Sequence, residues 1–419
     1  MTALSLALAV PAALFAVLPG EHGVSRAAGV CRGGEALTTS FGEWFDPNAQ
    51  LSGSSEPSRT ASKIVPDLLN PAIAVRLQLE ATSPAGQRWT LVLRDPRLRV
   101  LSILSEQDFR LANGGTAIQW TGRLEASQVS AELVGGGPGV TIRFAGGMAL
   151  PKDSHGTNVF SSQVAGSPSW TNPFDNSAAV YRRATEAVGM MVTGLKFPNA
   201  QGVIQKETWC CSGAMLTSDI FITNWHCGGP TTLPESLYWN DQVQKNSIID
   251  LGWQEGSAPR RQYAVTQVLQ ADQRLDYALL RVRPTVGPGA ATGRAIPVRI
   301  NRQLPADNQV FVVHHAECRA KLLSSNCMIE SRSYRAWTDP LTRTTGPDIT
   351  HRCDTEPGAS GAPVFDMQGN MIALHHLGFQ KADAANQCTS DKLNKAVGLD
   401  SILEDVKQKK PALYAELAG

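Results

Sequence analysis

The chain has 419 residues, enough for two or three domains, and its 42% hydrophobic and 18% charged content is ordinary for a globular protein. Its net charge is +1, and like charges do not cluster. Composition therefore gives no reason to expect nucleic acid or an acidic membrane surface as a partner.

The first segment is apolar. Residues 4–18 are apolar, the first twenty residues carry no charge, and the sequence Ser25-Arg26-Ala27 resembles a cleavage site. This pattern predicts a signal peptide at residues 1–27 and a protein that is secreted or periplasmic. The basic residues that usually open a signal peptide are missing, which leaves open a start codon upstream. A membrane anchor is the alternative, but Pro11 interrupts a stretch that is barely long enough.

Residues 28–150 predict a β-rich domain. Short stretches of alternating apolar and polar residues lie between turns rich in glycine and proline, and this texture is typical of a small β-sandwich. The clearest stretches are 74–80, 89–94, 117–124 and 129–134. No catalytic group stands out in this region. Residues 151–180, rich in proline, serine and glycine, are expected to be a linker.

In the remaining segment, residues 181–419, a histidine follows a short predicted core strand. Ile220 to Ile222 form a short apolar run that predicts a buried strand, and His226 comes at its end. Cys227 directly follows the histidine, and a disulfide from it to Cys211 would hold the loop that carries His226. The alternative is a core histidine beside a structural cysteine.

An aspartate opens the next apolar run. Asp276 directly precedes residues 277–280, which predict a buried strand. A carboxylate at the mouth of such a strand is costly unless it is hydrogen-bonded, and a histidine N–H is a suitable partner. Asp272 is a competing candidate, but it lies several residues before the strand. A turn aspartate without a catalytic role is the simpler alternative.

Three further histidines raise the question of a metal. His314 and His315 end the apolar run 310–313, and His351 follows later. Neighbouring residues on a strand point to opposite faces, and no carboxylate lies at ligand spacing. We therefore expect no metal, and no motif suggests a cofactor.

Ser360 lies in the sequence Glu356-Pro-Gly-Ala-Ser-Gly-Ala-Pro363. A serine on a tight glycine turn exposes its hydroxyl and aims two backbone N–H groups at one point, which acyl transfer requires. Alone this pattern is weak, because Gly-Ser-Gly turns are common in linkers. With His226 and Asp276 upstream, it predicts a nucleophile. The last segment, 399–418, predicts a helix.

The order His226, Asp276, Ser360 is the chain order of the chymotrypsin-like proteases. Residues 211–227 resemble their histidine loop, 276–280 their aspartate strand and 358–363 the loop of their nucleophile. Within this family, residues 355–361 are similar to bacterial lysyl endopeptidases, and 351–355 to secreted peptidases related to the glutamyl endopeptidases. The resemblance covers roughly residues 180 to 410.

The resemblance implies an all-β fold, with a chymotrypsin-like double six-stranded β-barrel after the small sandwich-like domain. It also implies a serine endopeptidase that cleaves proteins or peptides through an acyl-enzyme, without a cofactor. Ser360 would be the nucleophile, His226 the base and Asp276 its orienting carboxylate. The N–H groups of Gly358 and Ser360 would form the oxyanion hole. We expect a monomer that leaves the membrane once the signal peptide is removed.

Substrate preference is less sharply indicated. Asp354 lies six residues before Ser360, where trypsin has its pocket aspartate, and this offset favours Lys or Arg before the scissile bond. His375 and His376 lie on the strand that lines the opposite wall of the pocket. A histidine there binds the substrate carboxylate in glutamyl endopeptidases, so a preference for Glu is the alternative. In a strand one of the two would line the pocket while the other packs.

Activation should differ from that of trypsin. Ala359 stands where trypsin has the aspartate that receives a newly cut N-terminus. Residues 28–150 are then either a propeptide that is removed or an accessory domain that is retained, and the sequence favours neither.

Eight cysteines without zinc-finger spacing predict disulfides in an oxidising compartment. Besides Cys211–Cys227, we expect a bond that tethers the nucleophile loop. We expect Cys353 to form this bond, with Cys327 as its preferred partner. A Cys318–Cys327 bond is the competing possibility. Cys210 needs a distant partner, for which Cys31 is a candidate.

Two other classes of function stay open. A catalytically dead homologue could act as a binding module, although the triad is intact. An esterase is the other, but the Gly-x-Ser-x-Gly pattern of α/β-hydrolases is absent, since residue 362 is alanine.

Overall fold

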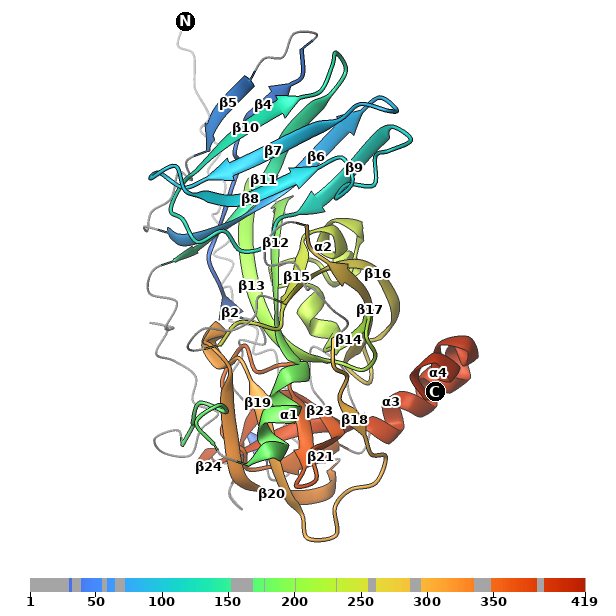
Figure 1. Ribbon diagram of the computed structural model, residues 1–419. Helices are drawn as coiled ribbons and strands as arrows, with labels where there is room; N and C mark the ends of the chain where they lie inside the picture. The colour runs from blue at the N-terminus through green and yellow to red at the C-terminus, as the bar shows by residue number, and fades with distance from the viewer. Residues whose placement is uncertain are drawn as a thin grey trace, which may run out of the picture.

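The computed structural model describes most of the chain after the expected signal peptide. The described residues are 30–31, 39–54, 59–64, 72–151, 169–176, 178–199, 201–230, 232–254, 261–286, 295–334, 348–382 and 388–418. The expected signal peptide and most of the expected linker lie outside them. Three β-rich units follow one another along the molecule, a sandwich and then two barrels (Figure 1).

The first unit is a sandwich of two antiparallel sheets. One sheet has the order β5 (Arg59–Ile64), β10 (Val129–Gly135), β7 (Trp89–Arg94) and β8 (Val100–Ser105). The other has the order β3 (Glu43–Phe45), β11 (Thr141–Pro151), β6 (Ala72–Ser83) and β9 (Gly115–Trp120), with β4 (Ala49–Ser52) also on β11. Alternation places Leu77, Leu91 and Leu133 between the sheets, fully buried.

The second unit is a closed barrel of six strands. Their order is β12 (Val188–Pro198), β15 (Ser247–Asp250), β16 (Gln262–Asp272), β17 (Tyr277–Pro284), β14 (Ile220–Thr223) and β13 (Ile204–Met215), and β13 pairs with β12 to close the ring. The short β2 (Thr39–Ser40) joins the outer edge of β13. Its helical segments are α1 (Ala179–Ala187), the 3-10 turns η1 (Trp225–Gly228) and η2 (Glu235–Leu237), and α2 (Asp241–Lys245).

The third unit is a second six-stranded barrel. Its order is β19 (Gln309–His314), β20 (Leu322–Tyr334), β21 (Asp348–His351), β24 (Cys388–Gly398), β23 (Asn370–Ala382) and β22 (Pro363–Asp366), and β22 pairs with β19. Two short strands, β1 (Val30–Cys31) and β18 (Arg299–Ile300), pair with β23, and the turn η3 (Ala316–Cys318) follows β19. Two closed barrels after a sandwich confirm the predicted chymotrypsin-like fold class.

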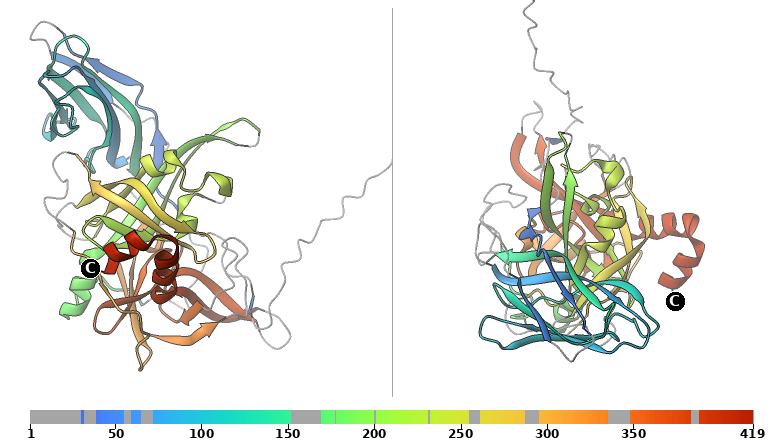
Figure 2. Two further views of the ribbon diagram at one scale, coloured as in Figure 1. Left: turned by 90° about the vertical axis from the view of Figure 1, so that its right-hand side faces the viewer. Right: turned by 90° about the horizontal axis from the view of Figure 1, so that it is seen from above.

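The C-terminal helices α3 (Leu399–Lys409) and α4 (Pro411–Ala418) lie on the flank of the barrels (Figure 2). Ile402 and Val406 of α3 are buried in a cluster that takes side chains from both barrels. The Tyr277 hydroxyl donates to Asp405 at 2.7 Å, and Arg281 pairs with Glu416 at 2.5 Å. The sequence predicts one helix here, whereas the structure has two, and they bridge the two barrels. No helix in the described ranges is long and apolar enough to cross a membrane.

The end of the expected linker packs against the second barrel. Thr171 makes a bridge to Leu323 of β20, and the indole N–H of Trp170 donates to the carbonyl of Asp354 at 3.0 Å. Arg319 lies over the Trp170 ring, 5.6 Å from its centre. Residues 169–176 are therefore anchored, although their composition predicts a linker.

Three disulfides join described residues. Cys211–Cys227 and Cys327–Cys353 are the pairings that the sequence favoured. The third bond is Cys210–Cys318, so neither Cys31 for Cys210 nor Cys327 for Cys318 is correct. The reason lies in the strand: neighbouring residues of β13 face opposite ways. Cys211 enters the barrel core, while Cys210 faces a cluster outside it that also holds Cys318.

Candidate active site

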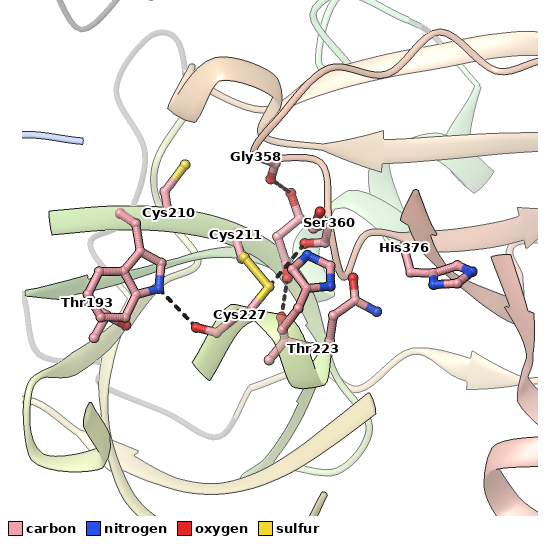
Figure 3. Close-up of a disulfide and its surroundings, with 12 residues drawn as sticks. Thr193, Cys210, Cys211, Thr223, Cys227, Gly358, Ser360 and His376 are labelled. Carbon is pink, nitrogen blue, oxygen red and sulfur yellow. Dashed lines mark hydrogen bonds between the residues drawn. A yellow bond between two sulfur atoms is a disulfide. The ribbon is translucent and has the colours of Figure 1, made fainter. Parts of the chain in front are cut away.

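His226 is held by the turn that ends β14. The 3-10 turn η1 carries it, and the side chain is fully buried. Cys227 anchors the turn twice, through its disulfide to Cys211 and through its carbonyl, which accepts the Trp209 indole N–H at 2.9 Å (Figure 3). The histidine therefore sits on a loop whose position is fixed by the barrel behind it.

Asp276 binds His226 with both carboxylate oxygens. The backbone N–H of His226 donates to Oδ1 at 3.0 Å, and Nδ1 lies 2.8 Å from Oδ2. A carboxylate only accepts, so the ring donates from Nδ1 and keeps Nε2 for other chemistry. Asn224 donates to the Asp276 carbonyl at 2.8 Å. Asp276 adopts φ 48°, which turns its side chain back toward this loop at the start of β17.

The carboxylate of Asp276 stays ionised despite complete burial. Burial alone would raise its pKa, but the electrostatic attraction of His226, with hydrogen bonds from His226 and His376, holds the pKa well below its usual value. The competing Asp272 has different partners. It accepts the Leu275 N–H at 2.7 Å and pairs with Lys409 of α3 at 2.5 Å. Asp276 is therefore the carboxylate that meets the histidine.

Two consecutive turns shape the Ser360 loop. The N–H of Ala359 donates to the Glu356 carbonyl at 2.9 Å, with Pro357 and Gly358 between them. Gly358 has φ +97° at the third position, which type II turns reserve for glycine. The N–H of Ala362 donates to the Ala359 carbonyl at 2.9 Å, and Gly361 has φ +84° at the third position of that turn.

This loop packs directly on the first barrel. The Ser360 carbonyl accepts the Ser212 N–H at 2.8 Å and lies 4.0 Å from Sγ of Cys227 (Figure 3). A Cβ on Gly361 would lie 2.2 Å from the Ser212 carbonyl oxygen, so no other residue fits there. A ring nitrogen of His226 lies within 4.8 Å of the same sulfur. His226 and the backbone carbonyl of Ser360 thus both lie close to the same disulfide, where the two barrels join.

The same neighbourhood could suggest a metal, since Cys211, His226 and Cys227 converge there. Both sulfurs, however, are consumed in the disulfide. Because the thiolate is the metal ligand, this group has only one donor to offer.

The backbone of the Ser360 loop is oriented by its neighbours. The Pro357 carbonyl accepts the Glu317 N–H at 2.6 Å, and in a trans peptide the Gly358 N–H then points the opposite way. The Gly358 carbonyl accepts the Ser212 hydroxyl at 2.8 Å, and that hydroxyl accepts the His315 N–H at 2.9 Å. The Ser212 hydroxyl was not foreseen, although it lies within the histidine block of the sequence.

Asp354 has partners within the chain. Its carboxylate accepts both the N–H and the hydroxyl of Ser169, at 3.0 and 2.9 Å. Its own N–H donates to the Ser324 hydroxyl at 2.8 Å. The carboxylate thus lies against the segment that precedes α1, and its place in a substrate pocket stays a prediction.

His375 lies beside the Ser360 loop and is buried. Its backbone carbonyl accepts the Gly361 N–H at 2.8 Å, and its Nδ1 lies 3.2 Å from Nε2 of His351. The N–H of Cys353 donates to Nδ1 of His351 at 3.3 Å. Burial lowers the pKa of His351 to about 3 and lowers that of His375 well below its usual value, so both rings are neutral. His351 must then donate from Nε2, which leaves His375 with its proton on Nε2.

His376 lies behind the Asp276 carboxylate rather than beside His375. Its Nδ1 lies 3.2 Å from Oδ2 of Asp276, and its Nε2 lies 3.7 Å from Oδ2 of Asp348. Lys395 approaches the same oxygen of Asp348 at 2.5 Å. The sequence named His376 as a pocket candidate and missed Asp348 and Lys395. No local signal marks Lys395, because the sequence of β24 also carries Asp391, Lys392 and Asn394.

The sequence was also compared with known families and proteins. Residues 211–374 match the model of the trypsin-like peptidase domain. The chain is 24% identical to the serine protease FAM111B of Homo sapiens over 217 residues, which are 43% of this chain and 27% of that protein. The chain thus covers well under two thirds of that relative.

The solved structures that the chain matches include the following two. One is the Rv3671c protease of M. tuberculosis H37Rv in its inactive form, with 13% identity, a TM-score of 0.36 and coverage of 55% of this chain and 93% of that chain. Deg5 has 14% identity and a TM-score of 0.36, over 54% of this chain and 89% of that chain. The stretch that matches the trypsin-like peptidase domain, residues 211–374, includes His226, Asp276 and Ser360.

Proposed function

We propose that this protein is an exported serine endopeptidase in which Ser360, His226 and Asp276 form the catalytic triad. The observation that carries the proposal is the buried His226–Asp276 pair, with the imidazole donating from Nδ1 at 2.8 Å beside the Ser360 loop. This arrangement leaves Nε2 to take the proton of the Ser360 hydroxyl as it attacks a peptide carbonyl. His226 then returns that proton to the leaving amine, and water repeats the cycle on the acyl-enzyme.

The oxyanion hole is assigned to the N–H groups of Gly358 and Ser360. The Pro357 carbonyl is turned toward Glu317, and the Ala359 carbonyl accepts the Ala362 N–H. Because carbonyl and N–H point in opposite directions in a trans peptide, the N–H groups of Gly358 and Ser360 point away from these bonds. Both N–H groups flank the Ser360 side chain, where negative charge develops during acyl transfer.

Labelling with a fluorophosphonate tests the triad and separates an enzyme from a dead homologue. We expect one label per chain, on Ser360, and cleavage of casein that Ser360→Ala lowers about 10⁴-fold or more. Ser331→Ala is the control, because this serine is partly exposed and its hydroxyl donates to the Ser333 carbonyl. Full activity in Ser360→Ala, or no label on the wild type, would reject the proposal. Parallel peptide and ester substrates distinguish a peptidase from an esterase.

Residue preference has two candidates. The offset of Asp354 favours Lys or Arg before the scissile bond, but two hydrogen bonds from Ser169 already occupy its carboxylate. The His351–His375 pair favours an acidic residue instead, because the ring of His375 carries its proton on Nε2, ready to donate to a carboxylate. We therefore propose two candidates for the residue before the scissile bond: Lys or Arg, and, as the second, an acidic residue.

A cleavage profile on a denatured protein separates the two preferences. If His375 binds the substrate, cleavage follows Glu, and His375→Gln raises KM about 10-fold or more for such sites. If Asp354 binds it, cleavage follows Lys or Arg, and Asp354→Asn has that effect. The exported location is supported by the disulfides, and recovery of the protein outside the cytoplasm tests it.

A further inference from the structure

The carboxylate of Asp276 is contacted from the side opposite His226 by a buried row of charged groups. His376 reaches it at 3.2 Å, Asp348 lies 3.7 Å from the far nitrogen of that ring, and Lys395 lies 2.5 Å from Asp348. We propose that Asp348 and Lys395 act through His376 as positioning residues that hold the Asp276 carboxylate on His226. The inference rests on the proposed function, because it concerns the same triad.

A β-bulge aims His376 at the triad. On β23, His375 pairs with Ala396 and Leu377 pairs with Lys395, so His376 is the extra residue that has no partner in the ladder. Such a residue bends the strand and redirects its side chain. The side chain of His376 crosses to Asp276, which belongs to the first barrel, and Figure 3 shows it beyond Ser360 on the side away from the disulfide.

The row is anchored in the second barrel. Asp348 begins β21, and Lys395 lies on the neighbouring β24, opposite Thr350 of β21. The side chains of His376, Asp348 and Lys395 are at most 2% exposed. Removing one charge from this row would leave a neighbouring charge buried without its partner, which costs free energy. These side chains therefore depend on one another for their positions.

Charges of opposite sign alternate along the row. Two carboxylates, Asp276 and Asp348, face the ring of His376, and Lys395 balances the second of them. The other titratable rings close to His376, His351 and His375, are neutral because burial lowers their pKa. Burial alone would also lower the pKa of His376, but its two carboxylate partners raise it to about 9. His376 is thus a cation at neutral pH.

The consequence for catalysis is orientation. Oδ2 of Asp276 receives Nδ1 of His226 at 2.8 Å and Nδ1 of His376 at 3.2 Å, while Oδ1 receives a backbone N–H. The carboxylate cannot rotate without losing one of these bonds. If Lys395 is lost, Asp348 and then His376 are free to shift, and the base loses its fixed direction. Chemistry should suffer more than substrate binding.

A double-mutant cycle on peptide hydrolysis tests the row. We expect Lys395→Met to lower kcat about 10-fold at pH 8 with little change in KM. In a His376→Asn background the same change should cost almost nothing further, and Lys395→Arg should restore most of the loss. Lys321→Met is the matched control, because Lys321 is also a buried lysine of the second barrel but bonds two carbonyls away from the triad.

The pH profile gives a second readout that simple destabilisation would not move. The charge of His376 is present below a pKa of about 9 and is lost as the pH rises through it, so kcat should fall there. Asp348→Asn removes one of its two carboxylates and should move this alkaline limb down by about one pH unit. Asp348→Asn keeps the volume of the side chain, so it can still test the inference if Lys395→Met does not fold.

Two results would overturn the inference. One is an equal loss of kcat from Lys395→Met in both backgrounds, and the other is an alkaline limb that Asp348→Asn leaves in place. Failure of the proposed function looks different, because the wild type would then take no fluorophosphonate label. Even in that case, NMR of histidine-labelled protein should show one ring, absent from His376→Asn, that titrates near pH 9.

Discussion

At the scale of a single residue, the two carboxylate oxygens of Asp276 have different roles. Oδ1 fixes the backbone of the histidine loop, while Oδ2 selects the ring tautomer by accepting the Nδ1 proton. The positive φ at Asp276 and the Asn224 bond to its carbonyl bring both oxygens to the same loop. In the triad that we propose, a carboxylate so placed would stabilise the imidazolium that forms when His226 takes a proton.

Asp276→Asn should therefore lower kcat about 10⁴-fold at neutral pH while the fold is kept. The amide offers a donor where the histidine needs an acceptor, which favours the wrong tautomer, and it cannot balance a positive ring. Steady-state kinetics, with circular dichroism as the check on folding, measures the effect. Asp272→Asn is the matched control and should change kcat less than about twofold, because that aspartate binds Leu275 and Lys409 instead. Equal losses in both variants would contradict this assignment.

At the scale of the element, the Ser360 loop is built by two glycines that face different neighbours. Both supply a positive φ and the space for close approach: a Cβ on Gly358 would lie 2.7 Å from the His315 carbonyl oxygen, and Gly361 lies against the first barrel. At Gly361 a Cβ would meet the Ser212 carbonyl at 2.2 Å and the Thr223 hydroxyl at 2.5 Å. The contact between the two barrels at the site depends on that missing side chain.

Gly361→Ala should push the Ser360 loop away from β13 and lower kcat about 100-fold or more. Gly202→Ala is the matched control, because Gly202 has a similar φ of +76° but nothing within 4 Å of the new Cβ. It should cost only the strain of the left-handed conformation, about 1–2 kcal/mol, without loss of activity. Active-site titration and thermal unfolding of both variants make the comparison. If Gly361→Ala behaves like Gly202→Ala, the close approach does not matter for catalysis.

Much of this site follows from local sequence patterns. The strand before His226, the aspartate that opens β17 and the turn around Ser360 each depend on residues close in the chain. The His375–His376 pair could be placed on a strand, but period-two alternation cannot foresee the bulge that sends His376 to Asp276. Asp348, Lys395 and the Cys210–Cys318 bond are brought together by barrel closure and packing. No local pattern encodes those distances.

At the scale of the whole molecule, the sandwich and the first barrel share a buried interface. Arg76 of β6 is fully buried and binds Asp250 of β15 at 2.8 Å, and Arg123 reaches the same carboxylate at 3.0 Å. Gln262 accepts from the Arg76 side chain at 3.2 Å. Around them, Phe41 and other apolar side chains of the sandwich form one cluster with strands β12 and β15 of the barrel.

This interface bears on whether the sandwich is a propeptide. Removing it would leave the Asp250 carboxylate without both arginines and would uncover Met190, Val192 and Ile248. A buried charge without its partners and an exposed apolar face are both strongly unfavourable. We therefore expect the sandwich to stay on the active protein. Intact mass and N-terminal sequencing of the exported form should show residues 39–151 still present, and a mature N-terminus near residue 180 would contradict this.

Arg76→Met tests the same interface energetically. The change leaves Asp250 buried with only one of its two cations, and it should lower the free energy of unfolding by about 3–5 kcal/mol. Arg99→Met is the control: it removes another Arg–Asp contact, with Asp95, but the Arg99 side chain is 70% exposed and the cost should stay below about 1 kcal/mol. We expect the sandwich and the first barrel to unfold together in a single urea transition. Arg76→Met should shift that whole transition to lower urea concentration. Two separate transitions, with only the first one shifted, would mean that the sandwich is an independent appendage whose loss the protease domain tolerates.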